Sequence, residues 1–182
     1  MKVTPLSIPD VLLIEPKIYE DDRGFFFESY NFNEFKKATS LDIAFVQDNH
    51  SKSAKGVLRG LHYQLDPYAQ GKLVRVIQGE VFDVAVDIRK SSPTFGKYVS
   101  QILSSENKKQ MWIPEGFAHG FLTLSDTSEF LYKTTIPYNA KDERCIIWND
   151  EVLKIKWPEN LPINTSQKDN VGSLFRKAEL FS

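Results

Sequence analysis

The stretch KLVRVIQGEVFDVAVDIR, from Lys72 to Arg89, contains two strand-like runs joined by a turn. KLVRVI leads into the turn Gln78-Gly79-Glu80, and VFDVAVDI then alternates apolar and polar side chains. Side chains two residues apart in a strand lie on the same face. The second strand therefore has an apolar face and an acidic face, formed by Phe82, Val84, Val86 and Ile88 and by Asp83 and Asp87 respectively.

Turn-forming segments recur at short intervals after this stretch. They are separated by MWI, FLTL and FLYKTT, which are rich in aromatic and β-branched residues. The turn segments are Ser91 to Gly96, Ser104 to Asn107, Pro114 to Gly116, Ser125 to Ser128 and Pro137 to Asp142. Short strands at this spacing are typical of an all-β sandwich or barrel. Two helical pieces are expected, one over Asn33 to Thr39 with an asparagine cap and one running from Ser166 toward Ala178.

Composition limits the class of protein. The 182 residues carry a net charge of −1, which argues against a nucleic-acid-binding surface. Residues 1–182 show no repeat or linker, so one domain is expected. Only VLLI, Val11 to Ile14, resembles an apolar signal core, and it is too short for a signal peptide or a membrane span. The single Cys145 gives no support for an oxidising compartment, so a cytoplasmic location is expected.

Three histidines are candidates for chemistry. His62 lies in VLRGLHYQ, Val57 to Gln64, and from the sequence alone it is open whether it fills a core, binds a metal or acts as a base. A lone histidine in a β domain is more often structural, and this reading is kept for His50 in QDNHS.

Two local patterns set His62 and His119 apart. Gly56 precedes His62 by six residues, and PEGFAH ends at His119; both resemble the half-motifs of the cupin superfamily, which are double-stranded β-helices of jelly-roll type. In metal-binding cupins the first half-motif has His-x-His followed by a glutamate. Here the second position is Gln64 and no glutamate follows in LDPYAQ, so no metal site is expected.

A cupin pocket without a metal takes its chemistry from side chains. The candidates are His62 as base, Lys72 as a positive charge, Tyr132 as acid, and Asp169 to orient the histidine. Each has an ordinary alternative: a solvated strand-end lysine, a core tyrosine, and an aspartate that caps a turn. Spacing alone does not connect the four residues.

A family resemblance connects them. The chain resembles the dTDP-4-dehydrorhamnose 3,5-epimerases over nearly its whole length and in the expected order. The segments that carry the likeness are RGFFFESY (Arg23 to Tyr30), QDNHS (Gln47 to Ser51), VLRGLHYQ, QGKLVRVIQGEVFDVAVDIR (Gln70 to Arg89), IPEGFAHGF (Ile113 to Phe121), PYN and WND.

The resemblance implies epimerisation of dTDP-4-dehydro-6-deoxy-D-glucose at C3 and C5, without a cofactor. The C4 ketone acidifies the hydrogens at both carbons. His62 is implied as the base and Asp169 as the group that orients it. Lys72 would stabilise the enolate oxygen, and Tyr132 would donate a proton from the opposite face.

The resemblance also implies a substrate-binding set and a homodimer. Tyr138 would stack on the thymine, and arginines would bind the diphosphate. The implied set is Arg23, Glu28, Gln47, Asp48, Asn49, Arg59, Lys72, His119, Tyr138, Glu143 and Lys168. N-terminal strands are expected to cross to the partner in the dimer, and the C-terminal segment to pack near the site.

One detail of the pattern needs an explanation. Arg59 and His62 have opposite parity, which in a flat strand would place them on opposite faces. A bulge, a strand end or a second subunit would reconcile the two assignments.

Other functions remain open at this stage. One group shares the scaffold: an epimerase that inverts only C3, or a keto-isomerase of a dTDP-4-keto-6-deoxy sugar. The others are a metal-dependent cupin and a non-catalytic jelly roll that binds a nucleotide sugar. Isotope exchange at each carbon, metal analysis and turnover distinguish them.

Overall fold

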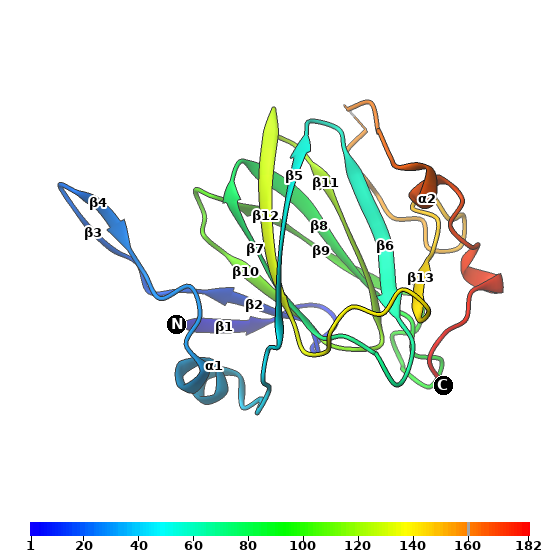
Figure 1. Cartoon of the computed structure of the whole chain (residues 1–182), viewed down its shortest axis with the longest axis horizontal. Coiled ribbons are helices and arrows are strands. Elements are labelled where there is room, and N and C mark those ends of the chain that lie inside the picture. The colour runs from blue at the N-terminus through cyan, green and yellow to red at the C-terminus, as the bar shows by residue number, and fades with distance from the viewer. Residues whose placement is uncertain (160) are drawn as a thin grey trace.

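Two antiparallel sheets face each other in the computed structural model, which describes residues 1–159 and 161–182 (Figure 1). The larger sheet has the strand order β1-β2-β10-β7-β12-β5 and the smaller has the order β13-β6-β11-β8-β9. The elements are β1 (Lys2–Pro5), β2 (Leu12–Glu15), β3 (Tyr19–Asp21), β4 (Gly24–Phe26), α1 (Phe32–Thr39), β5 (Gln47–Ala54), β6 (Leu58–Gln64), β7 (Lys72–Gln78), β8 (Glu80–Asp87), β9 (Tyr98–Ser104), β10 (Gln110–Ile113), β11 (Phe117–Thr123), β12 (Thr127–Thr134), β13 (Glu143–Cys145), α2 (Gln167–Asn170) and the 3-10 turn η1 (Phe175–Lys177). The predicted all-β jelly roll with a few short helices is confirmed.

The opening stretch of the sequence connects the two sheets. β7 lies in the larger sheet between β10 and β12, whereas β8 lies in the smaller sheet between β11 and β9. The turn at Gly79 therefore carries the chain from one sheet to the other. Residues of β7 and β8 face each other across the interior, where side chains from both sheets interdigitate.

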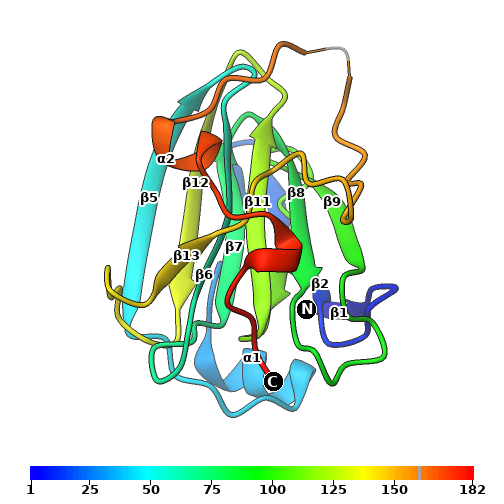
Figure 2. The same cartoon turned by 90° about the vertical axis from the view of Figure 1, so that its right-hand side faces the viewer.

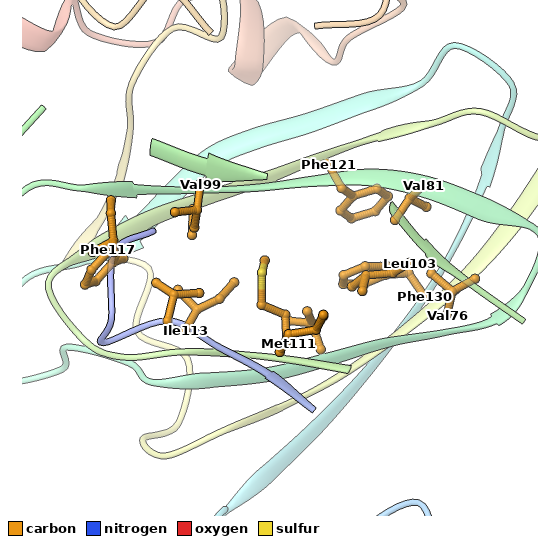
Figure 3. Close-up of a cluster of buried hydrophobic side chains, with 14 residues drawn as sticks. Val76, Val81, Val99, Leu103, Met111, Ile113, Phe117, Phe121 and Phe130 are labelled. Carbon is orange, nitrogen blue, oxygen red and sulfur yellow. The ribbon is translucent and has the colours of Figure 1, made fainter. Parts of the chain in front are cut away.

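The main core fills the space between the sheets. Val76 on β7, Val81 on β8, Met111 on β10 and Phe130 on β12 belong to one buried cluster (Figure 3). Together with the other apolar side chains of this cluster, they lie between the two sheets. Val84, Val86 and Ile88 share one face of β8, as the alternation predicted, and they belong to a second cluster on the outer face of the smaller sheet.

The C-terminal segment covers that second cluster. Figure 2 shows the C-terminal segment in front of the smaller sheet, and Leu153, Trp157 and Phe175 belong to the same cluster as Val84 and Val86 of β8. The smaller sheet is thus buried on both faces. For this reason the acidic positions of β8 do not face solvent, and both Asp83 and Asp87 are fully buried.

The helical predictions were correct in place but not in every cap. α1 is capped by Asn31, whose side chain accepts from the Glu34 amide, so Asn33 lies inside the helix. Ser166 caps α2, as predicted, and its hydroxyl accepts from the amide of Asp169. In the part of the chain that the structure describes, no helix is long and apolar enough to cross a bilayer.

A bulge in β6 resolves the parity of Arg59 and His62. His62 pairs with His119 and Arg59 pairs with Phe121, so three steps on β6 match two on β11. The irregularity is at Gly60, which has a φ of 127°. A Cβ there would lie 2.5 Å from the Cα of Gly120. Only glycine fits this bulge, which turns the side chains of Arg59 and His62 toward the same cavity.

We predict that Gly60→Ala destabilises the protein by about 1–3 kcal/mol or more, because it adds an unfavourable φ to a backbone clash. Urea denaturation followed by circular dichroism measures the change. Gly96→Ala is the matched control, because Gly96 also has a positive φ of 72° but an added Cβ would meet nothing nearer than 3.4 Å. Equal losses in the two variants would contradict the close approach at the bulge.

Candidate active site

A cavity of about 250 Å³ opens between the two sheets. β5, β7 and β12 line it from the larger sheet, and β6, β11 and β13 line it from the smaller one. The lining residues are Ser51, Arg59, His62, Tyr63, Gln64, Gln70, Lys72, His119, Phe121, Phe130, Tyr132, Tyr138 and Glu143. Seven of the predicted site residues are in this set.

His62 and Asp169 form a hydrogen-bonded pair at the wall of the cavity. His62 Nε2 lies 2.6 Å from Asp169 Oδ1, although the two residues are 107 positions apart in the chain. Asp169 also accepts from the Ser166 hydroxyl at 2.7 Å. With Nε2 held by the carboxylate, Nδ1 is the ring nitrogen available to a substrate. The predicted pairing of these two residues is therefore present as a contact.

The surroundings keep Asp169 ionised despite its burial. Its side chain is almost inaccessible, and burial alone would raise the pKa. The hydrogen bonds from His62 and Ser166 outweigh burial and lower the pKa of the carboxyl below its usual value. An ionised Asp169 favours a proton on the neighbouring Nε2 and stabilises the imidazolium that forms when Nδ1 gains a second proton.

Lys72 is a buried ammonium facing the histidine. It begins β7 in the larger sheet, and its Nζ reaches the carbonyl oxygen of His62 at 3.3 Å. Only 7% of the residue is exposed, so the alternative of a solvated strand-end lysine is wrong. Burial lowers the pKa of Lys72 to about 8, while Asp83 and Glu143 partly oppose the shift.

His119 is paired with a buried aspartate that the sequence reasoning did not select. His119 Nε2 lies 3.0 Å from Asp83 Oδ2. Burial lowers the pKa of His119 and raises the pKa of Asp83, since both charged forms lose solvation. The signal for Asp83 was its position on the acidic face of a strand that is otherwise apolar. The register that pairs β8 with β11 was needed to identify its partner.

Tyr132 enters the cavity from the wall opposite His62. Tyr132 is on β12 of the larger sheet, whereas His62 is on β6 of the smaller sheet. Burial raises the pKa of Tyr132, with a further contribution from Glu143, so the phenol keeps its proton near neutral pH. An imidazole and a protonated phenol thus line one cavity from opposite sheets.

A polar rim connects Tyr138, Glu143 and Lys168. The hydroxyl of Tyr138 donates to Glu143 Oε2 at 2.6 Å, and Lys168 Nζ lies 2.5 Å from the same oxygen. Burial would raise the pKa of Glu143, but the hydrogen bonds from Lys168 and Tyr138 lower it. Gln47 accepts from the Tyr138 backbone amide at 2.9 Å and donates to Asn49. These predicted binding residues form one connected border.

Three predicted binding residues lie away from this cavity in the single chain. Arg23 is 90% exposed and pairs with Asp21 in the β3–β4 hairpin, which projects from the body of the protein (Figure 1). Glu28 follows that hairpin and accepts from Asn31. Asp48 forms an ion pair with Lys133. Its side chain is exposed, whereas the residues on either side of it in β5 are on the other, less exposed face of the strand. The sequence analysis expected N-terminal residues to cross to a partner, and the binding role of these three residues stays a prediction.

Several lining residues were not predicted. Gln64 was considered only as a missing metal ligand, yet its side chain accepts from the Asn139 amide and donates to the Tyr68 carbonyl. Phe121 and Phe130 stack with centroids 4.2 Å apart and form the apolar floor. Their alternation resembled that of core residues, so nothing in the sequence separated them from the rest of the core.

Comparison with known proteins identifies the family. The family model described as dTDP-4-dehydrorhamnose 3,5-epimerase matches residues 5–177. A dTDP-4-dehydrorhamnose 3,5-epimerase from Shigella flexneri is 61% identical over 181 residues, which cover 100% of this chain and 99% of the relative. A crystal structure of a 3,5-epimerase from Legionella pneumophila, in complex with dTDP-4-keto-L-rhamnose, aligns with a TM-score of 0.95 at 49% identity. The alignment covers 98% of this chain and 94% of that one.

A one-centre enzyme is more distant. ChmJ, a 3'-monoepimerase from Streptomyces bikiniensis, has the same fold with a TM-score of 0.90 but is 31% identical, over 97% of this chain and 88% of that one. Fold and similarity together define the chain as an isomerase of cupin type that acts on a dTDP-sugar. It belongs to the dTDP-4-dehydrorhamnose 3,5-epimerase family, and the predicted function in dTDP-rhamnose biosynthesis is confirmed.

We predict that Lys72→Met raises the free energy of unfolding at pH 7 by on the order of 1–3 kcal/mol while reducing activity, because the ammonium is buried at a cost. Below pH 8 the lysine is protonated in both the folded and the unfolded protein, so the folded state bears the full free-energy cost of burying the ammonium. As the pH rises from about 8 toward 10.5, the folded protein loses the proton first, which stabilises the wild type relative to the variant.

Urea denaturation of both proteins between pH 6 and 10 would measure this difference, with roughly pH 8 as the start of convergence. A difference in stability that stays constant across this range would contradict the lowered pKa of Lys72.

Proposed function

We propose that His62 is the catalytic base of a two-centre epimerisation at C3 and C5 of dTDP-4-dehydro-6-deoxy-D-glucose. The observation that carries the proposal is the pair of His62 and Asp169 at the wall of a cavity that Lys72 and Tyr132 also line. The reaction needs a base, an anion-stabilising group and an acid on the far side, and this cavity contains one of each.

The proposed reaction starts at a carbon next to the C4 ketone. Nδ1 of His62 removes the proton, and the electron pair moves to the ketone oxygen to form an enolate. The Lys72 ammonium stabilises that oxygen, where charge grows in the transition state. Since the Lys72 pKa of about 8 lies near neutral pH, the lysine is also able to share its proton with the enolate.

Inversion requires that the proton return from the other face. Tyr132 comes from the sheet opposite His62, so its hydroxyl approaches the sugar ring from the other side. The tyrosinate left behind regains a proton before the second centre reacts. His62 correspondingly passes its proton to solvent, and the same sequence at C5 completes the product dTDP-4-dehydro-L-rhamnose.

The rim residues suit the nucleotide part of the substrate. Arg59 lines the cavity and presents a guanidinium, which binds a diphosphate oxygen pair well. Tyr138 is 55% exposed at the rim and is proposed to stack on thymine; base–aromatic stacking is worth about 1–3 kcal/mol in nucleic-acid complexes. We assign His119, Glu143, Lys168, Gln47 and Asn49 to orientation of the substrate around these two contacts.

We further propose that two copies of this chain complete the site. The projecting β3–β4 hairpin exposes Phe25 and Phe26, each more than half accessible, and carries Arg23 away from its own cavity. Apolar side chains exposed on an extended arm favour packing against a second molecule. In a homodimer the partner's Arg23 would reach the cavity of this chain. We also propose that residues 1–182 form one cupin-like domain. The enzyme would work in the cytoplasm, on nucleotide sugars present there.

We predict that the wild type, incubated with this substrate in D2O, exchanges hydrogen for deuterium at both C3 and C5. Proton NMR follows the loss of each signal. His62→Asn should reduce both exchange rates by about 10²–10⁴-fold, since it removes the general base. Exchange at C3 alone would move the chain to the one-centre epimerases, and no exchange with intact binding would leave a nucleotide-sugar-binding protein.

Tyr132→Phe separates proton removal from inversion. The variant keeps the base, so deuterium should still enter at C3, returned from the same face without inversion. Product formation should fall much further than exchange. If exchange and inversion fall equally, Tyr132 is not the acid on the far face.

Complementation tests the shared site. Arg23→Ala and His62→Asn each inactivate a homodimer, and mixing them after unfolding and refolding produces heterodimers. If the partner's Arg23 serves the site of His62, roughly a quarter of all sites in a random mixture are intact, and activity returns to that level. A mixture as inactive as its components would show that Arg23 and His62 do not act across two subunits.

A further inference from the structure

Cys145 adds a third ligand-type side chain to the catalytic pair. β13 pairs with β6 so that Cys145 is opposite His62. Its Sγ lies 4.0 Å from Asp169 Oδ1, which itself lies 2.6 Å from His62 Nε2. One ligand atom from each of the three residues lies within 4.8 Å of the others. Among the residues that the structure describes, this is the one such group of three or more.

We propose that His62, Cys145 and Asp169 form a site for Zn²⁺ and that an ion bound there inhibits the enzyme. The inference rests on the proposed role of His62 as base. The site is distinct from the metal site of other cupins, which uses a second histidine where this chain has Gln64.

The donor set and its spacing suit zinc. Imidazole nitrogen, thiolate sulfur and carboxylate oxygen bind Zn²⁺ at about 2.0–2.3 Å, so ligand atoms around a tetrahedral ion are about 3.3–3.8 Å apart. The distance from Cys145 Sγ to Asp169 Oδ1, 4.0 Å, is longer than this range, and the distance from His62 Nε2 to the same oxygen, 2.6 Å, is shorter. Side-chain rotations would bring both distances into the range. A thiolate and a carboxylate also balance the charge of the ion. His62 is partly exposed to the cavity, which provides an entry route.

Zinc at this place would disable the base without filling the substrate pocket. The ion replaces the proton on His62 Nε2, and a neutral imidazole then carries its single proton on Nδ1. An Nδ1–H donates and does not accept, so it is unable to remove a proton from the sugar. The proton of the Cys145 thiol is released to solvent. Arg59 and Tyr138, the proposed nucleotide contacts, remain free.

The surroundings make the binding reversible. Lys72 donates to the backbone oxygen of His62, and Lys168 lies close by in its ion pair with Glu143; both positive charges oppose a cation. Burial also raises the pKa of Cys145 to about 12, so zinc must displace a tightly held proton. The nearby positive charges and the raised pKa of the thiol weaken zinc binding. The site is therefore better suited to reversible inhibition by free zinc than to a permanently bound metal ion.

Two measurements test the site, both on the 182-residue chain freed of metal with EDTA and dialysed. In the first, deuterium exchange at C3 and C5 is followed while Zn²⁺ is titrated. The wild type should lose exchange as zinc is added and regain it with EDTA, while dTDP binding measured by calorimetry is retained. Cys145→Ser is the matched variant: its exchange without zinc should equal that of the wild type, and inhibition should require about tenfold more zinc or greater.

The second measurement does not depend on activity. Co²⁺ replaces zinc, and a near-ultraviolet thiolate-to-cobalt band should appear in the wild type and be absent in Cys145→Ser. Equal zinc sensitivity of the two proteins, or cobalt binding without that band, would overturn the site. Failure of the proposed function would instead appear as missing exchange before any metal is added, with the cobalt band unaffected.

Discussion

The hydrogen bond between His62 and Asp169 joins parts of the protein that the chain keeps far apart. β6 belongs to the smaller sheet, whereas α2 lies in the C-terminal segment that covers that sheet (Figure 2). Asp169 reaches the histidine because Ser166 caps the short helix and binds the carboxylate. The second apolar cluster, which holds the C-terminal segment on the sheet, therefore also positions His62, the residue proposed as the base.

The cavity requires charges that do not favour folding. Lys72 and Asp83 are buried beside apolar strands. Burial lowers the pKa of Lys72 and raises the pKa of Asp83, so it favours the neutral form of each. The apolar core lies directly beside them, because Phe121 and Phe130 of the main cluster also line the cavity (Figure 3). Each buried charge also has a partner, with Asp83 on His119 and Lys72 on a backbone oxygen. Such groups are expected where function requires shifted pKa values.

Much of the fold followed from local patterns, because alternation and turn residues are local properties. The strands from Lys72 to Arg89 and the cap at Ser166 were predicted for this reason. The bulge at Gly60 was one of three explanations for the parity of Arg59 and His62, and only the register with β11 selected it. Asp83 was missed as the partner of His119 because cross-strand pairs depend on sheet order. Arg23 and Glu28 were predicted by family likeness alone, and no local pattern in the sequence places them relative to the cavity.

The most direct test of the central claim is the protonation of the His62 ring in the free enzyme. Nitrogen-15 NMR of histidine-labelled protein, at a pH where His62 is neutral, distinguishes the two tautomers, and His62→Asn assigns the signal. With Asp169 ionised at 2.6 Å from Nε2, the account predicts a proton on Nε2 and an unprotonated Nδ1. A proton on Nδ1 in the metal-free enzyme would contradict it, because the nitrogen that faces the substrate would then have no lone pair to accept a proton.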